Sequence, residues 1–119
     1  MRLLIIAVLV LGLVASPHAS AHAFPDSSSP HAGQVLSSSP GQVQVTFDSE
    51  IEPVFSTLIV KNAAGTAVST GKGEVAPSNH VLLHTSLPKS LPPGKYVVYW
   101  SVVAHDGHHT EGHFPFTLQ

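Results

Sequence analysis

Apolar and polar residues alternate along residues 42–48, which is typical of a strand that has one face in the core. The inward positions would be Val43, Val45 and Phe47. Residues 95–104 are instead apolar at nearly every position. A run of this kind predicts a central strand that is covered on both faces.

Three shorter apolar runs predict further strands at residues 57–61, 81–85 and 113–118. The turn residues 62–65 predict a hairpin in which residues 66–70 return beside the first of these strands. Within the last run, Pro115 suggests an edge position or a bulge, because proline has no N–H to donate to a neighbouring strand.

No segment combines helical periodicity with capping residues, and the Ser, Pro and Gly residues of 27–41 disfavour regular helix. Several short strands separated by Gly and Pro turns are typical of an antiparallel sandwich or a Greek-key barrel. The sequence therefore predicts an all-β, immunoglobulin-like fold of about seven strands.

Residues 1–21 have the pattern of a secretory signal peptide. Arg2 precedes the apolar run 3–15, and residues 19–21 (Ala-Ser-Ala) form a small-x-small cleavage motif. The apolar run is too short, and has the wrong flanks, for a lasting transmembrane anchor. Residues 22–119 would then form one small mature domain, in the periplasm or secreted.

Cleavage after Ala21 would make His22 the first residue of the mature protein. The free α-amine and the imidazole of an N-terminal histidine can close a chelate ring on one metal ion. A cut after Ala23 also satisfies the small-x-small rule, but it would leave Phe24 first and remove that ligand. We favour the cut after Ala21, because serine is a more usual middle residue of the motif than histidine.

The composition of residues 22–119 limits the available chemistry. This part of the chain has no Cys and no Met, so disulfides, thiolate or thioether ligands and a thiol nucleophile are excluded. Four lysines and seven carboxylates give a net charge of −3 without a basic patch. Nucleic acids and anionic lipids are therefore poor partners. Eight histidines are a large number beside so few charged residues.

A group of potential metal ligands follows the predicted central strand, in the His-Asp-Gly-His-His sequence of residues 105–109. Alternate residues of an extended chain share a face, so Asp106 and His108 would converge if Gly107 keeps the extended geometry, with His105 and His109 opposite. Asp-Gly is also a common turn dipeptide, and a turn could present the same ligands. Nitrogen and oxygen ligands without sulfur suit Cu(II) or Ni(II), and Zn(II) less specifically.

With these residues in view, the mature chain resembles the CopC family of periplasmic copper-binding proteins over nearly all of residues 22–118. The specific part of the signature is the first histidine together with the Asp-Gly-His and Gly-x-x-x-Phe patterns. The positions that carry the resemblance are His22-Ala23, Ser29-Pro30, Gly33, Leu36, Pro40, Val43, Val45, Phe47, Leu91, Pro93-Gly94, Tyr96, Val98, Trp100, Asp106-Gly107-His108, Gly112 and Phe116.

The resemblance implies a cupredoxin-like Greek-key β-barrel that binds one Cu(II) ion per chain. It implies that the ligands are the amine and imidazole of His22, the carboxylate of Asp106 and the imidazole of His108. We expect an exported, monomeric, non-enzymatic protein that sequesters or carries copper in copper resistance and homeostasis. Delivery to an inner-membrane copper transporter is the further step that the resemblance suggests.

The chain departs from the family pattern at two places. Residues 62–71 contain no Met and no His where some members carry a Met-rich loop, so we expect no Cu(I) site of the Met type. Ser49 stands where many members place a glutamate, and Glu50 is its neighbour.

The remaining histidines have more ordinary interpretations. We expect His105, His109 and His113 to be solvated or to support the ligands from behind, and His80 and His84 to lie on the surface.

Two other functions stay open at this point. One is an oxidative, polysaccharide-cleaving copper enzyme of the histidine-brace type, which Asp106 as a ligand and the short chain disfavour. The other is an immunoglobulin-like interaction domain without metal, which a Cu(II) titration would separate from a copper carrier.

Overall fold

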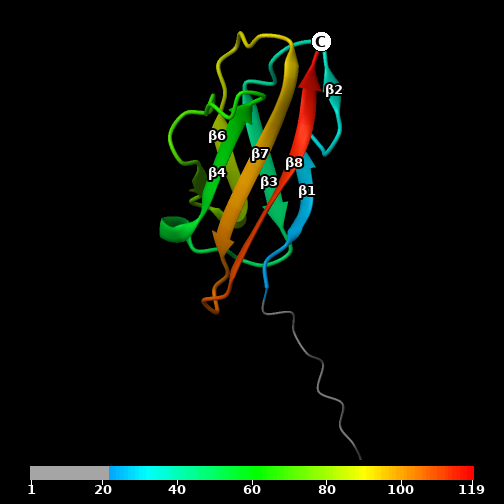
Figure 1. Cartoon of the computed structure of the whole chain (residues 1–119). Helices are drawn as coiled ribbons and strands as arrows, with labels where there is room; N and C mark the ends of the chain where they lie inside the picture. The colour runs from blue at the N-terminus through cyan, green and yellow to red at the C-terminus, as the bar shows by residue number, and fades with distance from the viewer. Residues whose placement is uncertain (1–21) are drawn as a thin grey trace, which may run out of the picture.

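Two four-stranded β-sheets pack face to face in the computed structural model, which describes residues 22–119 (Figure 1). The first sheet has the strand order β1-β3-β6-β5 and the second β2-β8-β7-β4. The strands are β1 (Pro25–Ser29), β2 (Val35–Leu36), β3 (Gln42–Phe47), β4 (Thr57–Asn62), β5 (Glu74–Ala76), β6 (Asn79–Ser86), β7 (Gly94–Val103) and β8 (His109–Leu118), with one 3-10 turn, η1 (Pro53–Phe55).

The predicted fold class is confirmed as a sandwich. Each sheet ends in edge strands, so the described chain does not close into a barrel. All pairings are antiparallel except the short one between β2 and β8. Within residues 22–119 no helix is long and apolar enough to cross a membrane. The predicted signal peptide and its cleavage motif lie outside the described residues.

The core lies between the two sheets and follows the strand alternation. Val43, Val45 and Phe47 of β3 are buried as predicted. Phe47 meets Trp100 of β7 edge to face, with ring centroids 5.5 Å apart. Gly112 of β8 lies opposite Trp100, and a Cβ atom there would come within 2.5 Å of the Trp100 ring. A side chain at position 112 would therefore displace the indole from the core.

Strand β7 is central in its sheet, between β8 and β4, as predicted. The prediction that both of its faces are covered is wrong. Val98 and Val102 are buried, whereas Tyr99, which points to the outer face, is 41% exposed. The outer face of β7 has no second layer within the described residues, so its apolar side chains remain partly in water.

The predicted return strand at residues 66–70 is also wrong. An isolated bridge pairs Lys61 with Ala67, and main-chain hydrogen bonds run from Asn62 N–H to the Thr66 carbonyl and from Val68 N–H to the Val60 carbonyl, but residues 66–70 form no strand. The Val60 N–H donates to the Ser69 hydroxyl at 2.9 Å, so a side chain takes the place of a main-chain acceptor. The main-chain pairing ends at this side-chain hydrogen bond.

Three short strands were not predicted: β1, β2 and β5. Strand β1 has the sequence Pro-Asp-Ser-Ser-Ser and lies at a sheet edge, mostly exposed. Strands β2 and β5 have two and three residues. None of them is long or apolar enough to show a period of two.

Strand β8 starts at His109, earlier than the predicted start at 113. The Pro115 carbonyl accepts a hydrogen bond from Gly33 N at 2.8 Å, and β2 pairs with β8 only from Thr117 onward. The N and O atoms of a strand residue point to the same side, so the proline nitrogen faces this loosely covered edge. Strand β8 lies between β2 and β7 and is not an edge strand, but β2 reaches only Thr117 and Leu118, so Pro115 meets no β2 partner.

The sandwich has two ends that differ in content. Residues 22–24, the loop 48–56 and the loop 104–108 meet at one end, which we call the N-terminal end (Figure 1). The Asp48 N–H donates to the Phe24 carbonyl, and Ile51 bridges to Ala104. At the C-terminal end, the loop 87–93 lies with the end of the chain.

Candidate metal centre

A tight turn joins β7 to β8 at the N-terminal end. The Gly107 N–H donates to the Ala104 carbonyl and the Ala104 N–H donates to the His108 carbonyl, both at 2.9 Å. Gly107 has a φ of 90°, a conformation that a residue with a side chain rarely adopts. The turn thus depends on the glycine between the two candidate ligands.

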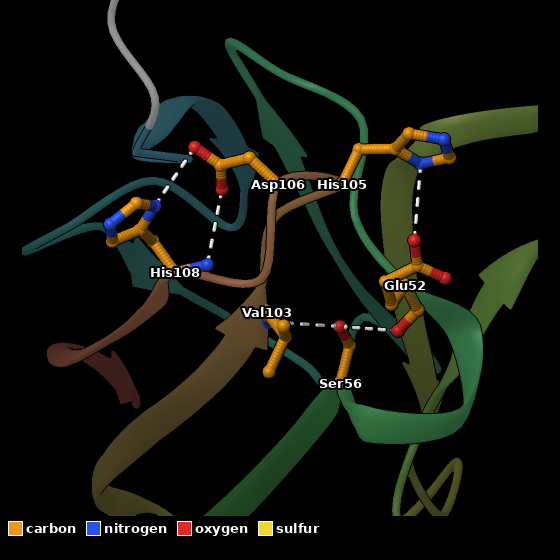
Figure 2. Close-up of polar contacts among 6 residues, drawn as sticks. All are labelled: Glu52, Ser56, Val103, His105, Asp106 and His108. Carbon is orange, nitrogen blue, oxygen red and sulfur yellow. Dashed lines mark hydrogen bonds and ion pairs between the residues drawn. The ribbon is translucent and has the colours of Figure 1, made fainter.

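Within this turn Asp106 and His108 contact each other directly (Figure 2). Asp106 Oδ1 accepts the His108 main-chain N–H at 3.1 Å, and Asp106 Oδ2 lies 2.9 Å from His108 Nδ1. The two side chains converge as predicted, but the cause is the turn and not an extended strand. Figure 2 also shows His105 on the other side of the turn, as expected.

The same contacts set the ionisation of the carboxylate. The main-chain N–H of His108, and next its imidazole, donate to Asp106 and lower the pKa of this carboxyl below its usual value. Slight desolvation opposes the shift, and the nearby His22 favours it. Asp106 is therefore an anion at neutral pH and offers oxygen lone pairs to a cation.

His22 joins this pair from the far end of the sequence. Its ring centroid lies 4.9 Å from that of His108, with the planes inclined by 40°. On the other side it stacks near Phe24, at 6.2 Å. The structure therefore brings together His22, Asp106 and His108, the three residues singled out as candidate ligands.

The chain that follows His22 is fastened to the sandwich at two points. The Thr110 hydroxyl donates to the Ala23 carbonyl at 2.6 Å, and Ala23 itself is fully buried. Asp48 accepts the Phe24 N–H through its side chain at 2.9 Å and returns its own N–H to the Phe24 carbonyl. Neither Thr110 nor Asp48 was singled out from the sequence. The only signal was strand alternation, which turns Thr110 inward.

The other histidines of the region have different partners. His105 Nδ1 lies 3.1 Å from Glu52 Oε1, beside η1 (Figure 2). His109 Nε2 lies 2.7 Å from the Ser101 hydroxyl on the outer face of the β7–β8 pair. His113 lies against the Tyr99 ring on the same face. The partners in these three contacts are thus Glu52, Ser101 and Tyr99, and none of them is a candidate ligand.

Two histidines and one glutamate of the sequence analysis are placed by their main-chain contacts. His84 pairs with Gln44 and Glu74 across the first sheet. The His80 main-chain carbonyl accepts the Ile51 N–H. Glu50 is exposed, and its main-chain carbonyl accepts the His105 N–H. The carboxylate of this loop that contacts the N-terminal segment is that of Asp48.

The side chains of the cluster are not arranged as a complete metal-binding site. Among residues 22–119, no group of three His, Asp or Glu side chains is arranged to hold a metal ion. The Asp106 carboxylate is hydrogen-bonded to His108, and the His22 nitrogen is a peptide nitrogen while Ala21 precedes it. The donor types present are imidazole nitrogen and carboxylate oxygen, which fit a borderline divalent metal.

Comparison with known proteins places these features in a family context. The model of the CopC domain matches residues 25–119, beginning three residues after His22. The chain is 38% identical over 112 residues to the copper transport protein CutJ of Bacillus subtilis, which is 93% of this chain and 21% of CutJ. It is 30% identical over 114 residues to protein YobA of Escherichia coli K12, which is 96% of this chain and 91% of YobA. The chain thus spans about a fifth of CutJ and most of YobA.

Two solved structures share the fold. CopC from Methylosinus trichosporium OB3b superposes with a TM-score of 0.76 at 30% identity, covering 82% of this chain and 94% of that one. PcoC, a methionine-rich copper resistance protein from Escherichia coli, gives a TM-score of 0.69 at 26% identity, covering 83% of this chain and 100% of that one. The described part of the present chain, in contrast to a methionine-rich protein, has no Met.

Proposed function

The chain belongs to the CopC family, and we propose that it is a copper-binding protein of copper resistance that holds one Cu(II) ion. The proposed ligands are the amine and imidazole of His22, the carboxylate of Asp106 and the imidazole of His108. The observation that carries this proposal is the convergence of the three residues, with the His22 and His108 rings 4.9 Å apart.

The donor set favours Cu(II) over Cu(I). Nitrogen and oxygen ligands bind Cu(II) well, and the affinity order of the divalent metals places Cu(II) above Ni(II) and Zn(II). Soft sulfur ligands, which Cu(I) prefers, are absent from residues 22–119. A protein with this donor set is suited to holding copper in one oxidation state, and we propose a carrier rather than an enzyme.

Binding would replace protons at three places. The amine and the two imidazoles bind metal only without their protons. A metal ion bound at Asp106 Oδ2 and His108 Nδ1, which lie 2.9 Å apart, would replace the hydrogen bond between these two atoms. Copper affinity is therefore expected to fall as the pH is lowered.

We also propose that the mature protein begins at His22 and acts outside the cytoplasm. The burial of Ala23 supports the cut after Ala21, because a cut after Ala23 would remove a core residue and the acceptor of the Thr110 hydrogen bond. Delivery of copper to an inner-membrane transporter is supported only by the name of CutJ, of which the chain spans about a fifth. We propose that the domain acts as a monomer.

The decisive experiment compares two N-termini. The protein is expressed with its own N-terminal segment, and the exported form is collected and weighed by mass spectrometry. Its Cu(II) affinity is then measured by visible absorption and EPR against a form with one extra residue before His22. We expect one tight equivalent for the form that begins at His22 and a much weaker one for the extended form. Equal affinity would overturn the N-terminal chelate.

A further inference from the structure

The hydroxyl of Thr110 connects the two chain segments that carry the candidate ligands. Thr110 lies on the inward face of β8, two residues after His108, and is 9% exposed. It donates to the carbonyl of Ala23, the residue after His22, at 2.6 Å. This bond joins positions 87 residues apart in the sequence.

The position of this hydrogen bond limits the conformations that His22 can adopt. Ala23 is fully buried, and Asp48 holds both main-chain groups of Phe24. With the next two residues fixed, only the torsions of His22 itself remain for its amine and imidazole. The N-terminus then loses most of its conformational entropy when the protein folds. This loss therefore does not reduce the free energy of copper binding.

We propose that Thr110 is a positioning residue of the copper site: its hydroxyl holds Ala23 so that His22 faces His108 before the metal arrives. This inference rests on the proposed function, because it names what orients one of the proposed ligands. Thr110 does not touch the metal; it acts through the Ala23 carbonyl.

The test uses three variants of the exported protein with its N-terminus confirmed by mass. Thr110→Val keeps the shape and removes the hydroxyl, and Thr110→Ser keeps the hydroxyl. Thr85→Val is the matched control, because Thr85 is 2% exposed and its hydroxyl donates to the Thr70 carbonyl at 3.4 Å, remote from His22. For each variant we measure the Cu(II) dissociation constant by competition, the EPR spectrum of the copper form and the free energy of unfolding.

We expect Thr110→Val to weaken Cu(II) binding about tenfold, equivalent to about 1.4 kcal/mol, and to broaden or shift the EPR spectrum. Thr110→Ser should restore both. Thr85→Val should lower the free energy of unfolding and leave copper binding within about twofold. If Thr110→Val lowers stability but leaves affinity and spectrum unchanged, the positioning role is overturned and the bond is structural only.

A metal-free measurement separates this inference from the proposed function. In the wild-type protein without copper, nuclear Overhauser contacts between the His22 and His108 ring protons should be present, since the centroids are 4.9 Å apart. Thr110→Val should weaken them, and Thr110→Ser should keep them. Loss of these contacts together with no Cu(II) binding by the wild type would support the tether and overturn the copper function. Contacts unchanged in Thr110→Val would overturn the tether whatever copper does.

Discussion

The two ends of the sandwich carry opposite kinds of residue. At the N-terminal end lie the candidate ligands and an acidic loop, with the carboxylates Asp48, Glu50, Glu52 and Asp106. Three of the four lysines lie toward the C-terminal end: Lys61, Lys89 and Lys95. Lys89 follows Pro88, and Lys95 follows the Pro92-Pro93-Gly94 turn. There the Tyr96 hydroxyl donates to the Pro92 carbonyl, and the Ser39 hydroxyl to the Pro88 carbonyl, both at 2.6 Å.

The comparison separates the frame, which is the two sheets with the loops of the C-terminal end, from the candidate metal centre at the N-terminal end. The C-terminal end is held by prolines and hydrogen bonds between loops, and its side chains form no candidate site among the described residues. The N-terminal end exposes Phe24, Val54 and Phe55 beside the histidines. Its excess of carboxylates produces a field that attracts a cation. The same sheets thus support one end whose loops are joined by hydrogen bonds and one end whose loops carry the candidate ligands.

The largest effect is expected from removing a proposed ligand at the N-terminal end. His22→Ala or His108→Ala should weaken Cu(II) binding by more than about 100-fold, since even residues behind the ligands of a metal site cost about 10–100-fold. A competition titration with a chelator of known affinity measures this. His80→Ala and His84→Ala are the controls and should change affinity by less than about twofold. A loss in His84→Ala equal to that in His22→Ala would place the site elsewhere.

A substitution in the core should lower the stability of the sheets without changing a candidate ligand. Gly112→Ala brings a Cβ within 2.5 Å of the Trp100 ring and should lower the free energy of unfolding by about 1–3 kcal/mol. Urea unfolding measures this. The double variant Gly112→Ala/Trp100→Phe should recover part of the loss, because phenylalanine lacks the second ring that meets the new methyl group. No recovery would mean that the contact with Trp100 is not the cause.

A smaller effect is expected from the acidic loop. Glu50→Gln together with Glu52→Gln should slow Cu(II) association about two- to fivefold at low salt, because the field that attracts the cation is weaker. Stopped-flow absorption measures the rate. The difference should vanish at high salt, where exposed charges are screened. Glu74→Gln, on β5 of the first sheet, should have little effect; an equal effect would show that total charge matters and not its position.

Sequence patterns predicted the frame better than the attachments of the site. The alternation of Val43, Val45 and Phe47 was sufficient for β3, because one face of a sheet is buried and the other is wet. The grouping of Asp106 with His108 was also expected, since they are two residues apart. The turn that causes it was only an alternative reading of Asp-Gly.

What could not be predicted depends on contacts between distant segments. Thr110 bonds to Ala23 across 87 residues, and Asp48 bonds to Phe24 across 24. No local period marks such pairs. Strand β1 escaped prediction for a related reason: an exposed edge strand is stabilised by main-chain bonds to β3, which place no demand on hydrophobic pattern.

The smallest expected effect concerns Asp106 in the metal-free protein. Its pKa lies below the usual carboxyl value, chiefly because the His108 main-chain N–H, and next the imidazole, bond to the anion. The folded form therefore holds its proton more weakly than the unfolded form. The stability that results is present above the ordinary carboxyl range and is lost as the pH falls through the lowered pKa. Because Asp106 is exposed, this contribution is small.

The variant His108→Ala separates the two hydrogen bonds that lower the pKa of Asp106, one from the main chain and one from the imidazole. The variant keeps the main-chain N–H at position 108 and loses the imidazole, so the pKa of Asp106 should rise only part of the way to its usual value. Titration of the Asp106 carboxyl carbon by NMR measures this. Gly107→Ala is the companion variant: it strains a turn with a φ of 90° and should disturb the main-chain bond, giving the larger rise. A complete return in His108→Ala would mean that the imidazole, and not the turn, holds the carboxylate in its charged form.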